Sequence, residues 1–246
     1  MTTSEINLRK IFSYFKWITS FNINGINYGG TANLVMDDRL IKFNNCYSVN
    51  GKRVLELGPF EAAHTLTLTR LGAKEVLAVE GQVENFIKCS IIKYLFDLNN
   101  CHFILEDVMK TDFKQLGNFD VCLCSGILYH LTDPYSVLKS ISQVTDNIFI
   151  WTQIAKKECP KGRAVDYRGY RGKYFSENSG GVLSGLEDKS IWLFTEDFLR
   201  MLKDVGFTEY KMLAEGTNER KHERISSWIR PKASWILVYA FKGKQK

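Results

Sequence analysis

Several short apolar runs of this 246-residue chain end in an acidic residue, a glycine or both. The first run ends in Glu56-Leu57-Gly58, the second in Glu80, which follows Gly58 by 22 residues, and the third in Asp107. An acid about twenty residues beyond a strand-end glycine is suited to accept hydrogen bonds from both ribose hydroxyls. A carboxylate beside the first turn repels a pyrophosphate and favours an ammonium or a sulfonium. The pattern therefore predicts a site for a positively charged nucleoside derivative.

A second group of residues follows the fourth run, in the segment FDVCLCSGILYHLTDP. Ser125 begins a tight turn there, and Tyr129 and His130 lie just beyond it. His130 is the candidate general base, since imidazole titrates near neutrality; the alternative is a histidine bonded to a carbonyl at a helix end. Tyr129 is predicted to orient an acceptor or to cover a sulfonium with its ring, the alternative being a packing role in the wall of the site.

Two tryptophans and one more histidine complete the set of candidates. Trp151 and Trp192 are candidates for an acceptor pocket, although large aromatic side chains more often belong to the core. His64, at the start of the first predicted helix, is placed to approach a cofactor, and capping or packing explains it as well.

The residues above need a sheet that brings the ends of several strands together. Strands are expected at 53–57, 75–79, 102–106, 119–124 and 147–151, with helices between them at 62–71, 82–98 and 134–144. A further helix begins at Thr195 and ends at Gly206, and two strands follow at 207–214 and 234–241. Strand and helix alternation requires crossover connections, so the sheet should be mainly parallel. We expect an α/β, Rossmann-like, doubly wound sheet of seven strands with an antiparallel pair at one edge.

Two segments lie outside this alternation. Residues 1–45 are predicted to form a helical cap, with an amphipathic helix first, a Gly- and Asn-rich loop at 24–34 and a short helix from Asp37 to Phe43. Residues 153–190 carry many basic and aromatic side chains in what we expect to be an irregular insertion. Such an insertion is typical of a lid or a binding loop, and a solvated lid is favoured here. Residues 1–246 are expected to form a single domain.

Composition limits the class of protein. The chain is 45% hydrophobic and 24% charged, as expected of a globular protein, and its net charge of +6 favours anionic partners only weakly. The six cysteines form no CxxC pair, and the four histidines show no metal-ligand spacing, so we expect no metal site. We find no secretion-signal pattern at the start and no apolar run long enough to span a membrane; a cytoplasmic location without membrane association is expected.

Taken together, the segments LELGPFEAAHT, AVEG, LEDV and FDVCLCSGILYHLTDP resemble the ordered motifs of class I S-adenosylmethionine-dependent methyltransferases. The resemblance implies that the turn at Gly58 holds the methionine part of the cofactor and Ser125 its amino-acid end. The cofactor-binding residues it implies are Glu56, Gly58, Phe60, Glu80, Gly81, Asp107, Val108 and Ser125. One departure is evident: that family commonly has further glycines where this chain has Phe60 and Ala62.

Three functions remain open at this point. A small-molecule methyltransferase acting at an oxygen, for example of a sugar, is favoured because the cap and the insertion are expected to enclose a pocket. A transfer-RNA-modifying enzyme is the second option, because GILYHLTDP is similar to a segment of the carboxymethyltransferases of the wobble uridine. A non-catalytic cofactor-binding subunit is the third, motivated by the missing glycines. A nicotinamide dehydrogenase fits poorly, since no GxGxxG is present. The oligomeric state is not predicted.

Overall fold

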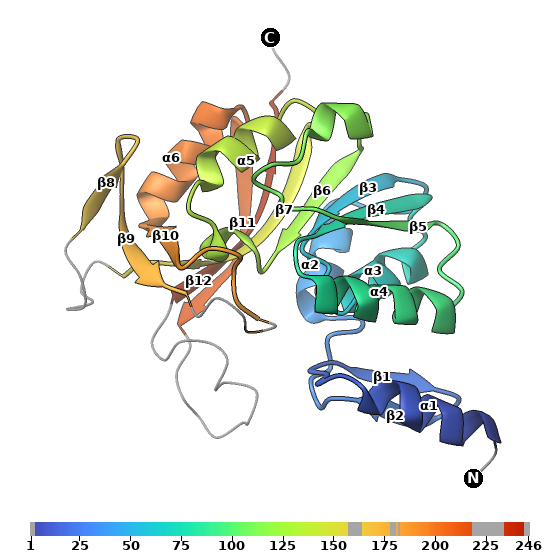
Figure 1. The fold of residues 1–246 in the computed structure, drawn as a ribbon. Helices are drawn as coiled ribbons and strands as arrows, with labels where there is room; N and C mark the ends of the chain where they lie inside the picture. The colour runs from blue at the N-terminus through green and yellow to red at the C-terminus, as the bar shows by residue number, and fades with distance from the viewer. Residues whose placement is uncertain (1–2, 157–163, 178–180, 182, 218–233, 244–246) are drawn as a thin grey trace.

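The computed structural model describes residues 3–156, 164–177, 181, 183–217 and 234–243. Its centre is one seven-stranded sheet in the order β11-β12-β7-β6-β3-β4-β5 (Figure 1). The strands are β3 (Arg53–Leu57), β4 (Glu75–Glu80), β5 (Cys101–Leu105), β6 (Val121–Ser125), β7 (Asn147–Ile154), β11 (Glu209–Thr217) and β12 (Ser234–Phe241).

Five of these strands, β7-β6-β3-β4-β5, pair in parallel, and β12 is antiparallel to both β7 and β11. The order reverses beside β3, because β4 and β5 lie on one side of it and β6 and β7 on the other. In open sheets of this kind, ligands bind at the carboxyl ends of the strands next to such a reversal. The predicted Rossmann-like sheet with an antiparallel pair at one edge is therefore confirmed.

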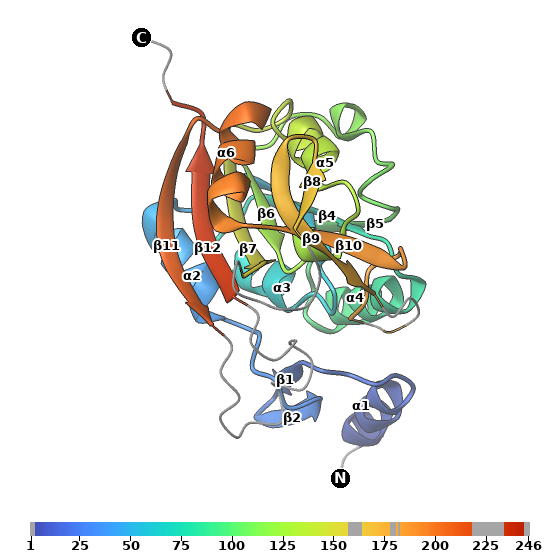
Figure 2. The same cartoon turned by 90° about the vertical axis from the view of Figure 1, so that its left-hand side faces the viewer.

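Helices cover both faces of the sheet, as Figures 1 and 2 show. The helices of one face are α5 (Pro134–Ile141) and α6 (Thr195–Val205), and those of the other are α2 (Asp38–Cys46), α3 (Ala63–Arg70) and α4 (Val83–Leu95). Two short 3-10 helices, η1 (Phe113–Leu116) and η2 (Leu128–His130), follow β5 and β6.

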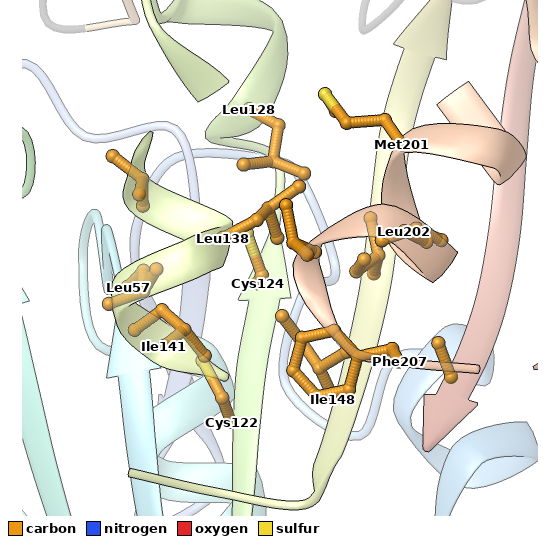
Figure 3. Packing of buried hydrophobic residues seen from close by; sticks show 14 of the residues in the cluster. Leu57, Cys122, Cys124, Leu128, Leu138, Ile141, Ile148, Met201, Leu202 and Phe207 are labelled. Carbon is orange, nitrogen blue, oxygen red and sulfur yellow. The ribbon is translucent and has the colours of Figure 1, made fainter. Parts of the chain in front are cut away.

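The two-residue period of a strand explains how one run of residues fills both cores. In β6, Cys122 and Cys124 pack under α5 and α6, whereas Val121 and Leu123 face the other helices (Figure 3). All four side chains are buried, so the cysteines behave as small apolar residues.

The N-terminal segment is only partly helical. It contains α1 (Thr3–Ser13), then an antiparallel hairpin of β1 (Ser20–Ile23) and β2 (Ile26–Gly29), and then α2. The prediction of a loop at 24–34 is wrong for the part that forms β2. The hairpin turns at Asn24-Gly25, where both residues have positive φ, as a two-residue turn between twisted strands requires.

The insertion is more regular than expected. It contributes a separate three-stranded antiparallel sheet in the order β10-β9-β8, made of β8 (Val165–Tyr167), β9 (Tyr170–Ser176) and β10 (Lys189–Leu193). The Ile191 amide of β10 donates to the Leu131 carbonyl at 3.0 Å, which joins this sheet to the end of η2. The prediction of an irregular segment is thus wrong for these strands, and residues 157–163, 178–180 and 182 lie outside the described part. No described helix has the length and apolarity needed to cross a membrane.

Candidate functional site

A cavity of about 650 Å³ opens at the carboxyl ends of the parallel strands. Eleven of the twelve residues that the sequence proposed for a site line it: Gly58, Phe60, Glu80, Gly81, Asp107, Val108, Ser125, Tyr129, His130, Trp151 and Trp192. The exception is Glu56. His64, the additional candidate, also lines the cavity.

The turn after β3 keeps the backbone form of a glycine-rich loop without the glycines. Gly58, Phe60 and Ala62 have φ values of +64°, +59° and +60°, so all three lie in the left-handed region. Gly58 donates its amide hydrogen to the Val79 carbonyl at 2.9 Å, and Phe60 donates its own to Glu80 Oε2 at 3.1 Å. Because Phe60 is part of the wall of an open cavity, its ring does not fill the site.

Glu80 is held at the end of β4 by backbone groups. Its Oε2 accepts the Phe60 amide, and its Oε1 accepts the Gln82 amide at 2.9 Å. Burial raises the pKa of Glu80, while these hydrogen bonds lower it. Asn85 and the Gly81 amide contribute further hydrogen bonds that lower the pKa of Glu80, so its carboxylate is held firmly in the cavity wall.

Asp107 lies at the end of β5 in a similar arrangement. Its Oδ1 accepts the Met109 amide at 2.9 Å, and its Oδ2 lies 3.3 Å from Lys110 Nζ. Val108, its neighbour, is buried and provides an apolar patch in the cavity wall. The two acids at the ends of neighbouring strands are therefore positioned by local turns.

Glu56 does not face the cavity. Its side chain is buried beside the sheet and accepts a hydrogen bond of 2.6 Å from the Thr65 hydroxyl of α3. Burial, together with the neighbouring charge of Glu80, raises the pKa of Glu56 to about 7 against the lowering effect of the Thr65 hydrogen bond. The expectation that Glu56 converges on the cleft is therefore corrected: period-two alternation turns it into the packing between β3 and α3.

Buried polar atoms without a partner gather in this cavity. His64 Nε2, Ser125 Oγ and Gln153 Oε1 are buried and form no hydrogen bond with any residue of the described ranges. Leaving a buried polar group unsatisfied costs about 1–3 kcal/mol. Three such atoms in one wall indicate a site built for a polar ligand.

His130 forms a pair with an acid from the insertion. Its Nδ1 lies 3.1 Å from Glu177 Oε2, and Glu177 Oε1 accepts the Ser190 hydroxyl at 2.7 Å. A carboxylate at Nδ1 favours the tautomer that carries its proton there, which leaves Nε2 with a free lone pair. Both side chains are mostly buried, with 18% and 7% exposed for His130 and Glu177. Such a pair has the composition that a general base with an orienting acid requires.

Aromatic rings surround this pair. The Tyr129 ring lies 4.2 Å from that of His130, and the rings of Trp151 and Trp192 meet it edge-on at 5.8 and 5.9 Å. Trp192 Nε1 donates to the Tyr129 carbonyl at 2.6 Å, while its ring stacks on Phe175 at 4.0 Å. Burial raises the pKa of Tyr129 to about 12, so its hydroxyl stays protonated at neutral pH.

The N-terminal segment closes one side of the cavity. The guanidinium of Arg39 lies 4.6 Å from the centre of a Trp151 ring and donates from Nε to Asp37 Oδ1 at 2.9 Å. Burial raises the pKa of Asp37, but the hydrogen bonds from Arg39 and the neighbouring His64 ring, whose Nε2 lies 3.9 Å from Asp37 Oδ2, outweigh this and hold the pKa well below its usual value. Glu61 connects the turn after β3 to the N-terminal segment, because its carboxylate accepts the amide hydrogens of residues 18 and 19.

The insertion covers the other side. Gln82, next to the Glu80 turn, donates from Nε2 to the Ser184 carbonyl at 2.6 Å. A Cβ on Gly81 would lie 2.7 Å from Leu186 Cδ1, so a glycine at this position lets the insertion approach the strand end. The cavity is therefore enclosed by the sheet edge, the N-terminal segment and the described part of the insertion.

Several of these residues were not found from the sequence. Gln153 follows Trp151 by two residues in β7, so strand periodicity alone could have placed both on one face. Glu177 and Arg39 carry no comparable signal, because their partners are distant in sequence or belong to another element.

Comparison with known proteins gives a consistent result. Residues 55–147 match the family model described as a methyltransferase domain. Among curated proteins, the chain is similar to the tRNA U34 carboxymethyltransferase of Campylobacter hominis, at 25% identity over 93 residues, and to that of Campylobacter fetus subsp. fetus, at 27% over 124 residues. These matches cover 38% and 48% of this chain and only 32% and 43% of the two relatives.

Solved structures match over much more of the chain. The N-terminal domain of EvdMO1, determined in the presence of SAH and D-fucose, is 27% identical, with a TM-score of 0.82 and coverage of 99% of this chain and 98% of that domain. The structure of EvdMO1 is 25% identical, with a TM-score of 0.70, and this chain covers 48% of it. TehB from Haemophilus influenzae, at 16% identity and a TM-score of 0.59 over 91% of this chain and 64% of TehB, shows a likeness of fold alone.

Proposed function

This chain belongs to the class I S-adenosylmethionine-dependent methyltransferases, and from that premise we propose that it methylates a hydroxyl oxygen of a small polar acceptor. One observation carries the proposal: the His130–Glu177 pair lies in the same cavity as the acids at the ends of β4 and β5. The pair supplies a proton acceptor, and the acids supply the hydrogen-bond acceptors that a nucleoside needs.

The residues present fit S-adenosylmethionine. Glu80 presents a carboxylate in the cavity wall as an acceptor for the ribose hydroxyls, and Asp107 with Val108 offers an acceptor and an apolar surface for adenine. Ser125 Oγ is buried without a partner in the described structure, as expected of a group that binds the amino-acid end. Buried carboxylates near the cavity also suit a cationic cofactor. These roles are proposals for the cofactor-binding residues.

The chemistry follows from the donor and the base. When bound, S-adenosylmethionine would supply an electrophilic methyl group to the acceptor oxygen, and its sulfur would leave with the electron pair of the broken carbon–sulfur bond. His130 Nε2 takes the hydroxyl proton. Glu177 stabilises the resulting imidazolium through Nδ1. The surrounding rings of Tyr129 and Trp192 limit access of water and hold the acceptor in place.

Three observations favour a small acceptor. The N-terminal segment and the insertion cover the cavity, and its acceptor end combines aromatic rings with a small number of placed polar groups, as is usual for small-molecule sites. Three of the described basic residues of the insertion are engaged within the protein: Arg168 pairs with Asp133, Arg171 with Asp197, and Lys173 is buried. The similar domain of EvdMO1 was determined in the presence of D-fucose, which supports a sugar-like acceptor.

A transfer RNA is the second candidate acceptor, supported by the two curated relatives. It is tested by measuring transfer-RNA binding between 50 and 200 mM salt. An RNA-binding enzyme that contacts 6–10 phosphates loses about 10³–10⁵-fold in affinity over that range. We expect only weak binding without such a slope.

The function itself is tested by calorimetry and by turnover. We expect the purified chain to bind S-adenosylmethionine and SAH with a single site. His130→Ala should bind the cofactor as the original does but lose about 10²–10⁴-fold in turnover of a hydroxyl acceptor. Absence of cofactor binding by a folded sample would reject the methyltransferase proposal, and equal turnover by His130→Ala would reject the base. Turnover with any acceptor would exclude a purely non-catalytic subunit.

We also propose a cytoplasmic location. Cys89, Cys101, Cys122 and Cys124 are buried free thiols in the structure, as is usual in a reducing compartment.

A further inference from the structure

Gln153 is a buried amide that the cofactor roles leave unused. It lies near the end of β7, is 5% exposed and lines the cavity, and its Oε1 forms no hydrogen bond with any described residue. Leaving a buried carbonyl oxygen without a donor costs about 1–3 kcal/mol, and a ligand that donates a hydrogen bond to it recovers this free energy.

The position of Gln153 relates it to the proposed base. Both residues line the same cavity, in which the Tyr129 ring lies 4.2 Å from the His130 ring. Trp151, two residues before Gln153 in the same strand, meets the Tyr129 ring edge-on at 5.8 Å. Gln153 and His130 therefore belong to the part of the cavity wall that contains the rings of Tyr129 and Trp151.

The surrounding charges indicate the chemistry of the donor. Arg39, beside Trp151, repels a cationic group, and its own charge is paired with Asp37. Glu177 is already bonded to His130 and to Ser190. A neutral hydroxyl meets these conditions, since it donates to Gln153 Oε1 and brings no charge into the site.

We infer that Gln153 selects acceptors that carry a second hydroxyl next to the one that is methylated, as a sugar ring does, by accepting a hydrogen bond from that second hydroxyl. The inference rests on the proposed function, because it assigns the methylated hydroxyl to His130. It adds a specificity-determining residue and narrows the acceptor class to neutral vicinal diols.

The test uses the full chain saturated with SAH, with D-fucose and its 2-, 3- and 4-monodeoxy analogues as probes and binding measured by calorimetry. The original chain should bind one of these analogues about 10–100-fold more weakly than D-fucose, because Oε1 is then left unsatisfied. Gln153→Met removes the amide but keeps a side chain of similar length. Its affinity for D-fucose should fall to the affinity that the original chain has for that analogue, and its affinity for the analogue should equal that of the original chain. Gln143→Met, the same substitution at an exposed position, should behave as the original.

The outcomes separate the two proposals. Failure of SAH to bind the original chain overturns the function. Two results with the original chain alone would overturn the inference. One is binding of SAH without binding of D-fucose, and the other is equal affinity for D-fucose and all three analogues. If Gln153→Met still binds the deoxy analogue more weakly than D-fucose by the same factor, Gln153 is not the residue that recognises the second hydroxyl. Gln153→Asn, which keeps an amide on a shorter side chain, should retain part of the discrimination if Gln153→Met does not fold.

Discussion

The adjacent residues Ala62 and Ala63 allow backbone strain to be measured in the turn after β3. They are adjacent alanines, both buried, at the start of α3. Ala62 has a φ of +60°, whereas Ala63 is the first residue of the helix. We expect replacement by glycine to have opposite consequences for strain at the two positions, because glycine adopts positive φ without a steric penalty.

The magnitudes can be worked out term by term. In either variant, the lost methyl group costs about 0.8 kcal/mol and the added freedom of the unfolded chain about 0.5–1 kcal/mol. At Ala62 alone, relief of the left-handed conformation returns about 1–2 kcal/mol. Ala62→Gly should therefore change the free energy of unfolding by less than about 0.5 kcal/mol, and Ala63→Gly should lower it by about 1.5 kcal/mol.

Urea unfolding of the two variants and the original chain, followed by circular dichroism, provides the assay. Since the chemical change is identical, the difference between the variants reports the strain at Ala62. Equal losses of stability would refute the reasoning and would mean that the left-handed backbone is not strained. Phe60, the other residue in place of a glycine, is a poorer test because its ring also lines the cavity.

The remaining predictions concern buried charge. Burial raises the pKa of Glu56 from 4.5 to about 7, so the stabilisation from its protonation is complete below pH 4.5 and is lost as pH rises through 7. Between pH 5 and pH 8, the free energy of unfolding measured in urea should fall by about 2–3 kcal/mol less for Glu56→Gln than for the original chain. An equal fall in both proteins would contradict this. Lys88→Met leaves the buried carboxylate of Glu61 without the ammonium 3.3 Å away and should lower the free energy of unfolding by about 3–5 kcal/mol; adding Glu61→Gln should restore part of the loss. Glu177→Gln should lower turnover of a hydroxyl acceptor without changing the affinity for SAH, because the His130 ring loses the carboxylate that orients it through Nδ1; unchanged turnover would show that Glu177 is only structural.

Much of the fold could be predicted because its signals are local. The strands at 53–57 and 234–241 were predicted with the bounds that they have, and the helix predicted from 134 begins at Pro134, with Asp133 as its cap. The acids at 80 and 107 were placed in the cavity because the carboxyl ends of parallel strands share one edge.

The hairpin at 20–29 was missed although Asn24-Gly25 is a strong turn signal. Its strands have four residues each, too few for their alternation to stand out from a polar loop. The strands of the insertion were missed because their basic residues look solvated in sequence. In the folded chain Lys173 is buried and Arg171 is paired with Asp197.

The sequence by itself determined the sheet, the strand ends and the acids that face the proposed cofactor, since periodicity and turn chemistry act between near neighbours. Only the tertiary structure decided the partners. It placed Glu177 on His130 across 47 residues, turned Glu56 toward Thr65, and left Gln153 Oε1 without a partner among the described residues. It also preserved left-handed backbone at Phe60 and Ala62, because hydrogen bonds to Glu80 and the packing of Glu61 against the N-terminal segment hold the loop where its own residues do not.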